Sequence, residues 1–248
     1  MENPSLRARP SWLAWLGRYE LGVLLSVLGL AGGLWIFLTI AGEVAAGGTL
    51  GYDQRLLLAM RNPDDLHDPL GPGWLEEMGR DVTALGGVAV LVLITAAVVG
   101  YLLLSRHYRT ALFTLFAIVG GWLLSNLLKT GFARPRPDLV PHEAIVYTAS
   151  FPSGHAMMAA VTYLTLAALL GRVVGRLRLK AYILLVAMLL TVLVGASRIY
   201  LGVHWPSDVL AGWTVGAAWA SCCWLLARRL QRRGRLEPEP PEQNGGSG

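Results

Sequence analysis

The sequence predicts an all-α fold, a polytopic membrane helix bundle with six transmembrane helices and both termini in the cytoplasm. Hydrophobic residues make up 54% of the 248 residues and charged residues only 15%, whereas an ordinary soluble domain has about 25% charged residues. Mean hydropathy is +0.50. A chain with so few polar groups cannot cover the surface of a soluble enzyme, and the same composition argues against a disordered protein.

Six apolar runs without Asp, Glu, Lys, Arg or His mark the spans. About 20 residues cross a hydrocarbon core, so the shortest runs are expected to extend into polar residues that face protein. The first run is longer than the apolar part of a usual signal peptide and predicts an uncleaved anchor. The predicted spans are 21–41, 82–104, 110–128, 156–171, 181–196 and 209–227.

The basic residues predict the orientation. One set of alternate flanks, which includes both ends of the chain, carries 14 of the 21 basic residues, and the other set carries seven. Cytoplasmic flanks are enriched in Lys and Arg, so both termini are expected inside. The basic residues are scattered over short loops, and we therefore expect no nucleic-acid partner.

Three segments are expected along the chain. Residues 1–19 place Trp and Leu among arginines and predict an interfacial N-terminal helix. Residues 20–228 form the membrane domain. Residues 229–248 become rich in Pro and Glu and then in Gly, which predicts a disordered cytoplasmic tail.

The connection 42–81 is the longest between spans, and it is expected to face outward. It carries eight acidic residues and three arginines. Apolar residues between Tyr52 and Arg61 predict a short helix lying at the membrane interface, which Asn62-Pro63 would end.

Polar residues gather on the outward side of the predicted bundle. They include three cations, two histidines and one aspartate, a combination that can bind an anion and transfer a proton. The amino ends of spans four and six point to this side, and the free N–H groups of a helix start favour phosphate. The residues are Lys129, Arg136, Ser153, Gly154, His155, Arg198, His204 and Asp208.

The two histidines differ in their sequence surroundings. His204 and Asp208 are four residues apart, so in a helical turn the carboxylate would reach the imidazole. It would fix the tautomer and leave the other ring nitrogen free to attack. His155 has no such partner and is free to act as an acid toward a leaving group. Arg134 is interpreted as a solvated neighbour.

Each of these residues alone has a simpler explanation. Lys129 or Arg198 at the end of a span is more often a snorkelling anchor. His155 can be a cap, and Asp208 a first-turn helix acid or a structural partner of His204. These explanations do not account for the convergence of all of these residues on one side of the bundle.

At these residues the chain resembles the type-2 phosphatidic-acid phosphatase superfamily of membrane lipid phosphatases. The resemblance covers roughly residues 50–227, and both spacers in the signature match. The signature consists of Lys-x6-Arg-Pro, Pro-Ser-Gly-His and Ser-Arg-x5-His-x3-Asp, which here are Lys129…Arg136-Pro137, Pro152-Ser153-Gly154-His155 and Ser197-Arg198…His204…Asp208.

The resemblance implies how phosphate would be held. Lys129, Arg136 and Arg198 would bind phosphate oxygens. The Ser153 side chain and the backbone of Gly154 would assist them.

The resemblance also implies the chemistry. His204 would attack phosphorus and form a phosphohistidine, and Asp208 would orient it. His155 would protonate the departing alcohol or phosphate. Family members need no metal, so no metal site and no cofactor are expected.

The implied substrate is a phosphate on a membrane lipid. Candidates are undecaprenyl pyrophosphate, phosphatidylglycerol phosphate, phosphatidic acid and a lipid A phosphate. The expected location is the inner membrane of a bacterium, with the site facing the periplasm. The oligomeric state is left open.

Three alternatives keep the polar cluster and change its use. A phosphohistidine resolved by the hydroxyl of a second lipid would make the protein a lipid phosphotransferase. An anion transporter would use the basic cluster as a selectivity ring, although the charges lie at helix ends on one side. An intramembrane serine protease would use Ser153 with a histidine, but nothing in the sequence supplies a separate oxyanion hole.

Overall fold

The structure, a computed structural model, describes residues 11–140, 148–174 and 176–236. This part of the chain is mostly helical, as predicted, with one short β-hairpin that the sequence did not suggest. Its elements are α1 (Ser11–Ala45), α2 (Leu50–Leu58), β1 (Arg61–Asn62), β2 (Asp65–Pro69), α3 (Gly73–Ala84), α4 (Val88–Leu104), α5 (Tyr108–Phe132), α6 (Gly154–Val173), α7 (Leu177–Tyr200) and α8 (Pro206–Arg232).

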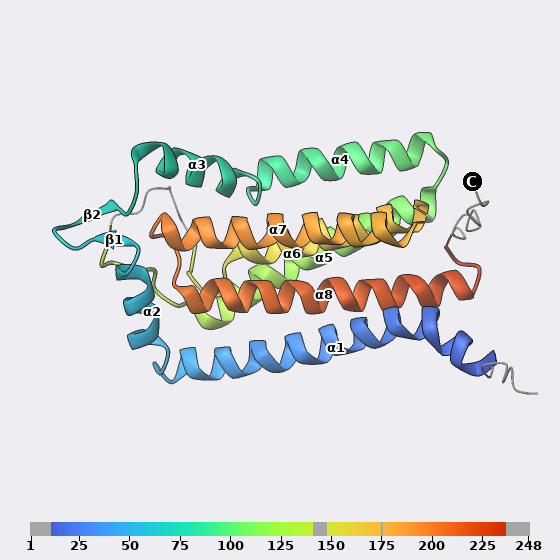
Figure 1. Cartoon of the computed structure of the whole chain (residues 1–248), viewed down its shortest axis with the longest axis horizontal. Coiled ribbons are helices and arrows are strands. Elements are labelled where there is room, and N and C mark those ends of the chain that lie inside the picture. Colours follow the sequence, from blue (N-terminus) through green and yellow to red (C-terminus); the bar gives the residue numbers. More distant parts are fainter. Residues whose placement is uncertain (1–10, 141–147, 175, 237–248) are drawn as a thin grey trace, which may run out of the picture.

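The long helices run side by side along the longest axis of the molecule (Figure 1). Five of them are long and apolar enough to cross a membrane, namely α1, α5, α6, α7 and α8. Helices α3 and α4 meet the same criterion only as a pair, which is bent by 46°. The chain is therefore a multi-pass membrane protein with five spans, or six if the bent pair crosses as one.

The predicted span 82–104 is not one continuous helix, because the chain breaks between Ala84 and Val88. The carbonyl of Leu85 accepts a hydrogen bond from the Tyr163 hydroxyl at 2.7 Å, so a neighbouring helix satisfies it. A side chain inserted into the backbone ladder is a recognised cause of a sharp bend. This interaction connects residues 78 positions apart, so the local sequence did not indicate it, although the pair Gly86-Gly87 lies at the break.

The start of α1 and the end of α8 lie at one end of the bundle, while α2 and the hairpin lie at the other (Figure 1). This arrangement fits an even number of crossings. Which end faces the cytoplasm remains a prediction.

The amino-terminal end differs from the expectation. Helix α1 runs without interruption from Ser11 to Ala45, so residues 11–19 belong to the same helix as the first span. They do not form the separate interfacial helix that was expected for residues 1–19. Residues 1–10 lie outside the described residues.

The carboxy-terminal end also differs. Helix α8 continues to Arg232, beyond the expected boundary at 228, and Leu236 is buried. The Arg109 Nη1 atom donates to the Gly234 carbonyl at 3.0 Å, which holds the turn after α8 against the start of α5. The rest of the predicted tail, 237–248, lies outside the described residues.

The connection 42–81 is more structured than expected. The predicted short helix is present as α2, but it buries Asp53 and Leu57. A β-hairpin and α3 follow it. In the hairpin, Asn62 Oδ1 accepts from the backbone of Asp64, and Asp65 Oδ1 accepts from the backbone of His67. Such side chain–backbone bonds compete with helix formation and favour turns.

Helix α8 packs closely on α6 through two glycines. A Cβ atom on Gly212 would lie 2.7 Å from the Ser153 carbonyl oxygen, and one on Gly216 would lie 2.7 Å from that of Met157. Small residues let helix backbones approach closely in membranes. This contact sets the first turn of α8 beside the first turn of α6, and the Ser153 N–H donates to the Asp208 carbonyl at 3.0 Å.

Candidate active site

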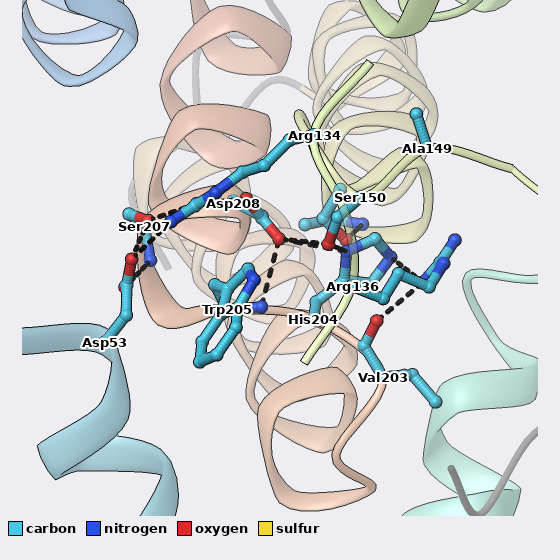
Figure 2. A network of polar contacts seen from close by, with 12 residues as sticks. Asp53, Arg134, Arg136, Ala149, Ser150, Val203, His204, Trp205, Ser207 and Asp208 are labelled. Atoms are coloured by element: carbon cyan, nitrogen blue, oxygen red, sulfur yellow. Dashed lines mark hydrogen bonds and ion pairs between the residues drawn. The ribbon is translucent and has the colours of Figure 1, made fainter. Parts of the chain in front are cut away.

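The signature residues meet at the end of the bundle where α6 and α8 begin and α7 ends (Figures 1 and 2). The segment after α5 crosses this end with the sequence Arg134-Pro135-Arg136-Pro137. Proline fixes φ and favours an extended preceding residue, and in extended backbone residues i and i+2 point to the same face. Both arginines therefore reach the same polar cluster.

Asp208 is at the centre of the cluster and is 0% exposed. Its Oδ2 atom accepts hydrogen bonds from the Ser150 hydroxyl and, at 3.0 Å, from the Trp205 backbone N–H. Its Oδ1 atom accepts from Arg134 Nη1 at 2.6 Å. Figure 2 shows the carboxylate between these partners.

His204 lies beside Asp208, as the spacing predicted, but not within a helical turn. Helix α8 begins only at Pro206, so His204 precedes it. The Asp208 side chain instead reaches back across the helix start. The His204 Nδ1 atom lies 3.5 Å from Asp208 Oδ2 and 3.3 Å from Ser150 Oγ. Both the carboxylate and the hydroxyl are therefore partners of Nδ1.

The neighbours of His204 determine its tautomer. Arg136 Nη1 lies 3.2 Å from His204 Nε2. A guanidinium can only donate, so Nε2 must carry the lone pair and Nδ1 the proton. The proton then points toward Asp208 and Ser150. The arrangement leaves the ring's lone pair on Nε2.

His204 lies in the segment between α7 and α8 and is 1% exposed. Burial lowers the pKa of its imidazole to about 3, against the opposing effect of Asp208. The ring is therefore neutral near pH 7.

The three predicted phosphate-binding cations lie close enough to interact electrostatically with one another. Arg136 also donates to the carbonyls of Val203 and Thr148. Lys129 Nζ donates to the Ala149 carbonyl at 2.7 Å. Arg198 is buried and donates from Nη1 to Thr83 Oγ1 at 3.0 Å.

Arg198 also has an unused donor. Its Nε atom is buried and finds no hydrogen-bond partner among the described residues. Leaving a buried donor unpaired is costly.

The predicted acid, His155, is the second residue of α6. Its electrostatic interactions are with Arg198, His204, Lys129 and Arg136, so it belongs to the same cluster. A Cβ atom on Gly86, at the break between α3 and α4, would lie 3.3 Å from the His155 Cβ atom. The break between α3 and α4 therefore packs against His155.

Ser153 and Gly154 form the start of α6, as predicted. The Ser153 side chain caps the helix by accepting from the Ala156 backbone N–H. A Cβ atom on Gly154 would lie 3.2 Å from Lys129 Cε. The first N–H groups of a helix have no partner within it, and here they lie next to a lysine.

The interpretation of Arg134 as a solvated neighbour was wrong. Its side chain is only 11% exposed and contacts two carboxylates, those of Asp53 and Asp208. It also donates to the hydroxyls of Ser207 and Thr49. The alternation of arginine and proline indicated that both arginines share one face. The motif spacing, which assigns a role only to Arg136, did not include this signal.

Asp53, Ser150 and Ser207 are further members of the cluster that sequence reasoning missed. Asp53 Oδ1 accepts from the Ser207 backbone N–H at 2.8 Å, and Oδ2 accepts from the Ser207 hydroxyl at 2.6 Å. An aspartate within a largely apolar segment was the available signal. Nothing in the sequence indicated Ser150.

Possible metal ligands do not gather in the part of the chain that the structure describes. No group of three His, Cys, Asp or Glu side chains there could hold a metal ion.

The sequence is similar to those of known membrane phosphatases. A family model described as the PAP2 superfamily matches residues 110–232. Phosphatidylglycerophosphatase B of Bacillus subtilis is 36% identical over 146 residues, which are 58% of this chain and 70% of that protein. Lipid A 1-phosphatase of Rhizobium etli is 30% identical over 191 residues, 68% of this chain and 78% of that protein.

The fold is similar as well. The crystal structure of a transmembrane PAP2-type phosphatidylglycerolphosphate phosphatase from Bacillus subtilis has a TM-score of 0.68 and 27% sequence identity. The match covers 83% of this chain and 97% of that one. Together with the identity that extends over most of its relatives' length, this shared fold shows that the chain belongs to the PAP2 superfamily.

Proposed function

We propose that this protein is an integral-membrane lipid phosphatase that hydrolyses a phosphomonoester or pyrophosphate through a phosphohistidine, without a metal ion. One observation carries the proposal: a buried, neutral His204 directs its Nε2 lone pair at a guanidinium, with its other nitrogen facing Asp208. The names of the relatives, which act on phosphatidylglycerol phosphate and on lipid A, support the substrate class.

The phosphate would lie between Lys129, Arg136 and Arg198, against the start of α6. Three cations and the helix N–H groups can stabilise the charge that a metal ion neutralises at other phosphoryl-transfer sites. Arg136 now donates to Nε2. A phosphate oxygen is a stronger acceptor for a guanidinium than a neutral imidazole, so binding would draw Arg136 onto the substrate and free Nε2.

The first step forms a bond between His204 Nε2 and phosphorus and breaks the bond from phosphorus to the lipid oxygen. Asp208 and Ser150 hold the Nδ1 proton and stabilise the positive charge that develops on the ring. His155 gives a proton to the departing oxygen. In the second step, water attacks phosphorus, His155 takes a proton from it, and the P–N bond breaks.

We expect purified protein to release phosphate from at least one lipid in a panel of undecaprenyl pyrophosphate, phosphatidylglycerol phosphate, phosphatidic acid and lipid A. Substrate labelled in its phosphate should leave the label on His204 when the reaction is stopped without acid. Activity should persist in EDTA. Label on a second lipid would indicate a phosphotransferase, and reversible loss of activity in EDTA would contradict the metal-free mechanism.

The site is proposed to face outward, in the periplasm of a bacterial inner membrane, with six spans. In a Cys222→Ser/Cys223→Ser background, Asp65→Cys should react with an impermeant thiol reagent added outside, because Asp65 is exposed in the hairpin. His107→Cys, exposed between α4 and α5, is the matched control and should react only after the membrane is opened. The reverse labelling would move the site to the cytoplasm.

His155 should matter most when the leaving group needs a proton. His155→Ala should slow single-turnover phosphoenzyme formation by about 10²–10⁴-fold with an alkyl phosphate, the usual contribution of general acid catalysis. The loss should be smaller with p-nitrophenyl phosphate, because p-nitrophenolate departs without full protonation. Equal losses with both substrates would show that His155 is not the acid.

A further inference from the structure

Arg134 joins two helices through their buried carboxylates. Its Nη2 atom donates to Asp53 Oδ2 on α2 at 2.8 Å, and its Nη1 atom donates to Asp208 Oδ1 on α8 at 2.6 Å. Both carboxylates are 0% exposed. Figure 2 shows the guanidinium between Asp53 and Asp208, on the side of Asp208 away from His204.

The two oxygens of Asp208 have separate tasks. Oδ2 faces Ser150, the Trp205 N–H and His204, whereas Oδ1 is held by Arg134. Among the described residues, Arg134 is the hydrogen-bond partner of Oδ1. The hydrogen bond from Arg134 to Oδ1 restricts rotation of the carboxylate, so Arg134 helps to set the direction in which Oδ2 points.

Asp53 in turn holds Arg134 and the first turn of α8. Its carboxylate accepts hydrogen bonds from the Ser207 N–H and hydroxyl, in addition to its ion pair with Arg134. A buried charge is stabilised only when it is paired and hydrogen-bonded. Removal of either partner therefore leaves an unbalanced charge next to Asp208.

We propose that Arg134 and Asp53 are positioning residues for the reaction: they hold Asp208, and through it His204, at the angle needed for attack on phosphorus. This inference rests on the proposed function. It connects α2, which lies outside the three signature segments, to His204 through Arg134 and Asp208. Neither residue touches the phosphate in this arrangement, which separates them from Lys129, Arg136 and Arg198.

Arg134→Gln tests this role. We expect kcat to fall by about 10–100-fold, by analogy with groups that orient metal-ligating histidines from behind. Inhibition by inorganic phosphate should change less than about threefold, because the binding cations are intact. Arg136→Gln is the matched comparison, and it should weaken phosphate inhibition clearly. Arg55→Gln, exposed on the same helix as Asp53, should keep the wild-type kcat.

A double-mutant cycle tests whether Asp53 acts through Arg134. Asp53→Asn should lower kcat, and adding it to Arg134→Gln should lower kcat no further, since coupled residues are not additive. Arg134→Lys should restore part of the activity, because an ammonium supplies charge without the two-pronged geometry. Asp53→Asn keeps the shape of the side chain, so it and Arg134→Lys carry the test if Arg134→Gln does not fold.

Three results would overturn the proposal: a wild-type kcat in Arg134→Gln, a loss of phosphate inhibition as large as in Arg136→Gln, or fully multiplicative losses in the cycle. Wild-type protein that releases phosphate from no lipid would instead refute the proposed function itself.

Discussion

Replacing His204 with alanine is expected to abolish turnover for every substrate, whatever its leaving group. The loss should be about 10⁶-fold, the size reported for removal of a nucleophile that acts as part of a unit. The reason is that Nε2 of His204 is the nitrogen that would bond to phosphorus, and its partner at Nδ1 already lies in place. The measurement is phosphate release together with the amount of labelled protein trapped.

His67→Ala is the matched control, because His67 is an exposed histidine in the hairpin at the same end of the bundle. It should keep the wild-type rate. His204 is buried, so the thermal unfolding of His204→Ala in detergent must be recorded to separate chemistry from folding. Residual labelling of a folded His204→Ala protein would show that the nucleophile is another residue.

Removing any one of the three proposed phosphate-binding cations should also cause a large loss of activity. Lys129→Ala, Arg136→Ala and Arg198→Ala should each cost about 2–4 kcal/mol of transition-state stabilisation, by analogy with deletion of one oxyanion donor. That corresponds to about a 30- to 1,000-fold fall in kcat/KM. The loss in Arg198→Ala is the most direct test of phosphate binding, because the buried Nε of Arg198 has no protein partner among the described residues.

The conservative variant Arg198→Lys should recover only part of the loss, because a compact ammonium does not reproduce the guanidinium fork. Arg178→Ala is the control, since Arg178 is exposed near the start of α7, at the other end of the bundle. It should leave kcat/KM unchanged. A loss at Arg178 equal to that at Arg198 would mean that the effect is on the membrane assembly rather than on phosphate.

The helices were largely predictable because their signal is local. Long apolar runs have few alternatives to a helix in a membrane, where every backbone group must be satisfied internally. The boundaries and the bend were not predictable from the runs. The break after Ala84 is accompanied by a hydrogen bond from the Tyr163 hydroxyl to the Leu85 carbonyl, and the extension of α8 past 228 is accompanied by the burial of Leu236.

The candidate site was likewise predictable only in part. The spacing of His204 and Asp208 predicted that they lie together, but they meet without a helical turn over 204–208, since α8 starts between them at Pro206. The prediction that Arg134 is a solvated neighbour was wrong because its partners, Asp53 and Asp208, are far from it in the sequence. No local pattern reports a contact over such a separation.

By itself, the sequence determined which residues are apolar enough to span a membrane and which polar types stand at the ends of those spans. Residue spacing was sufficient for this, because helix periodicity and charge placement are properties of neighbouring residues. Only the tertiary structure decided which oxygen of Asp208 faces His204, which nitrogen of His204 keeps its lone pair, and that α2 reaches the site through Arg134. These features depend on the packing of separate helices, and packing brings together groups that the chain keeps apart.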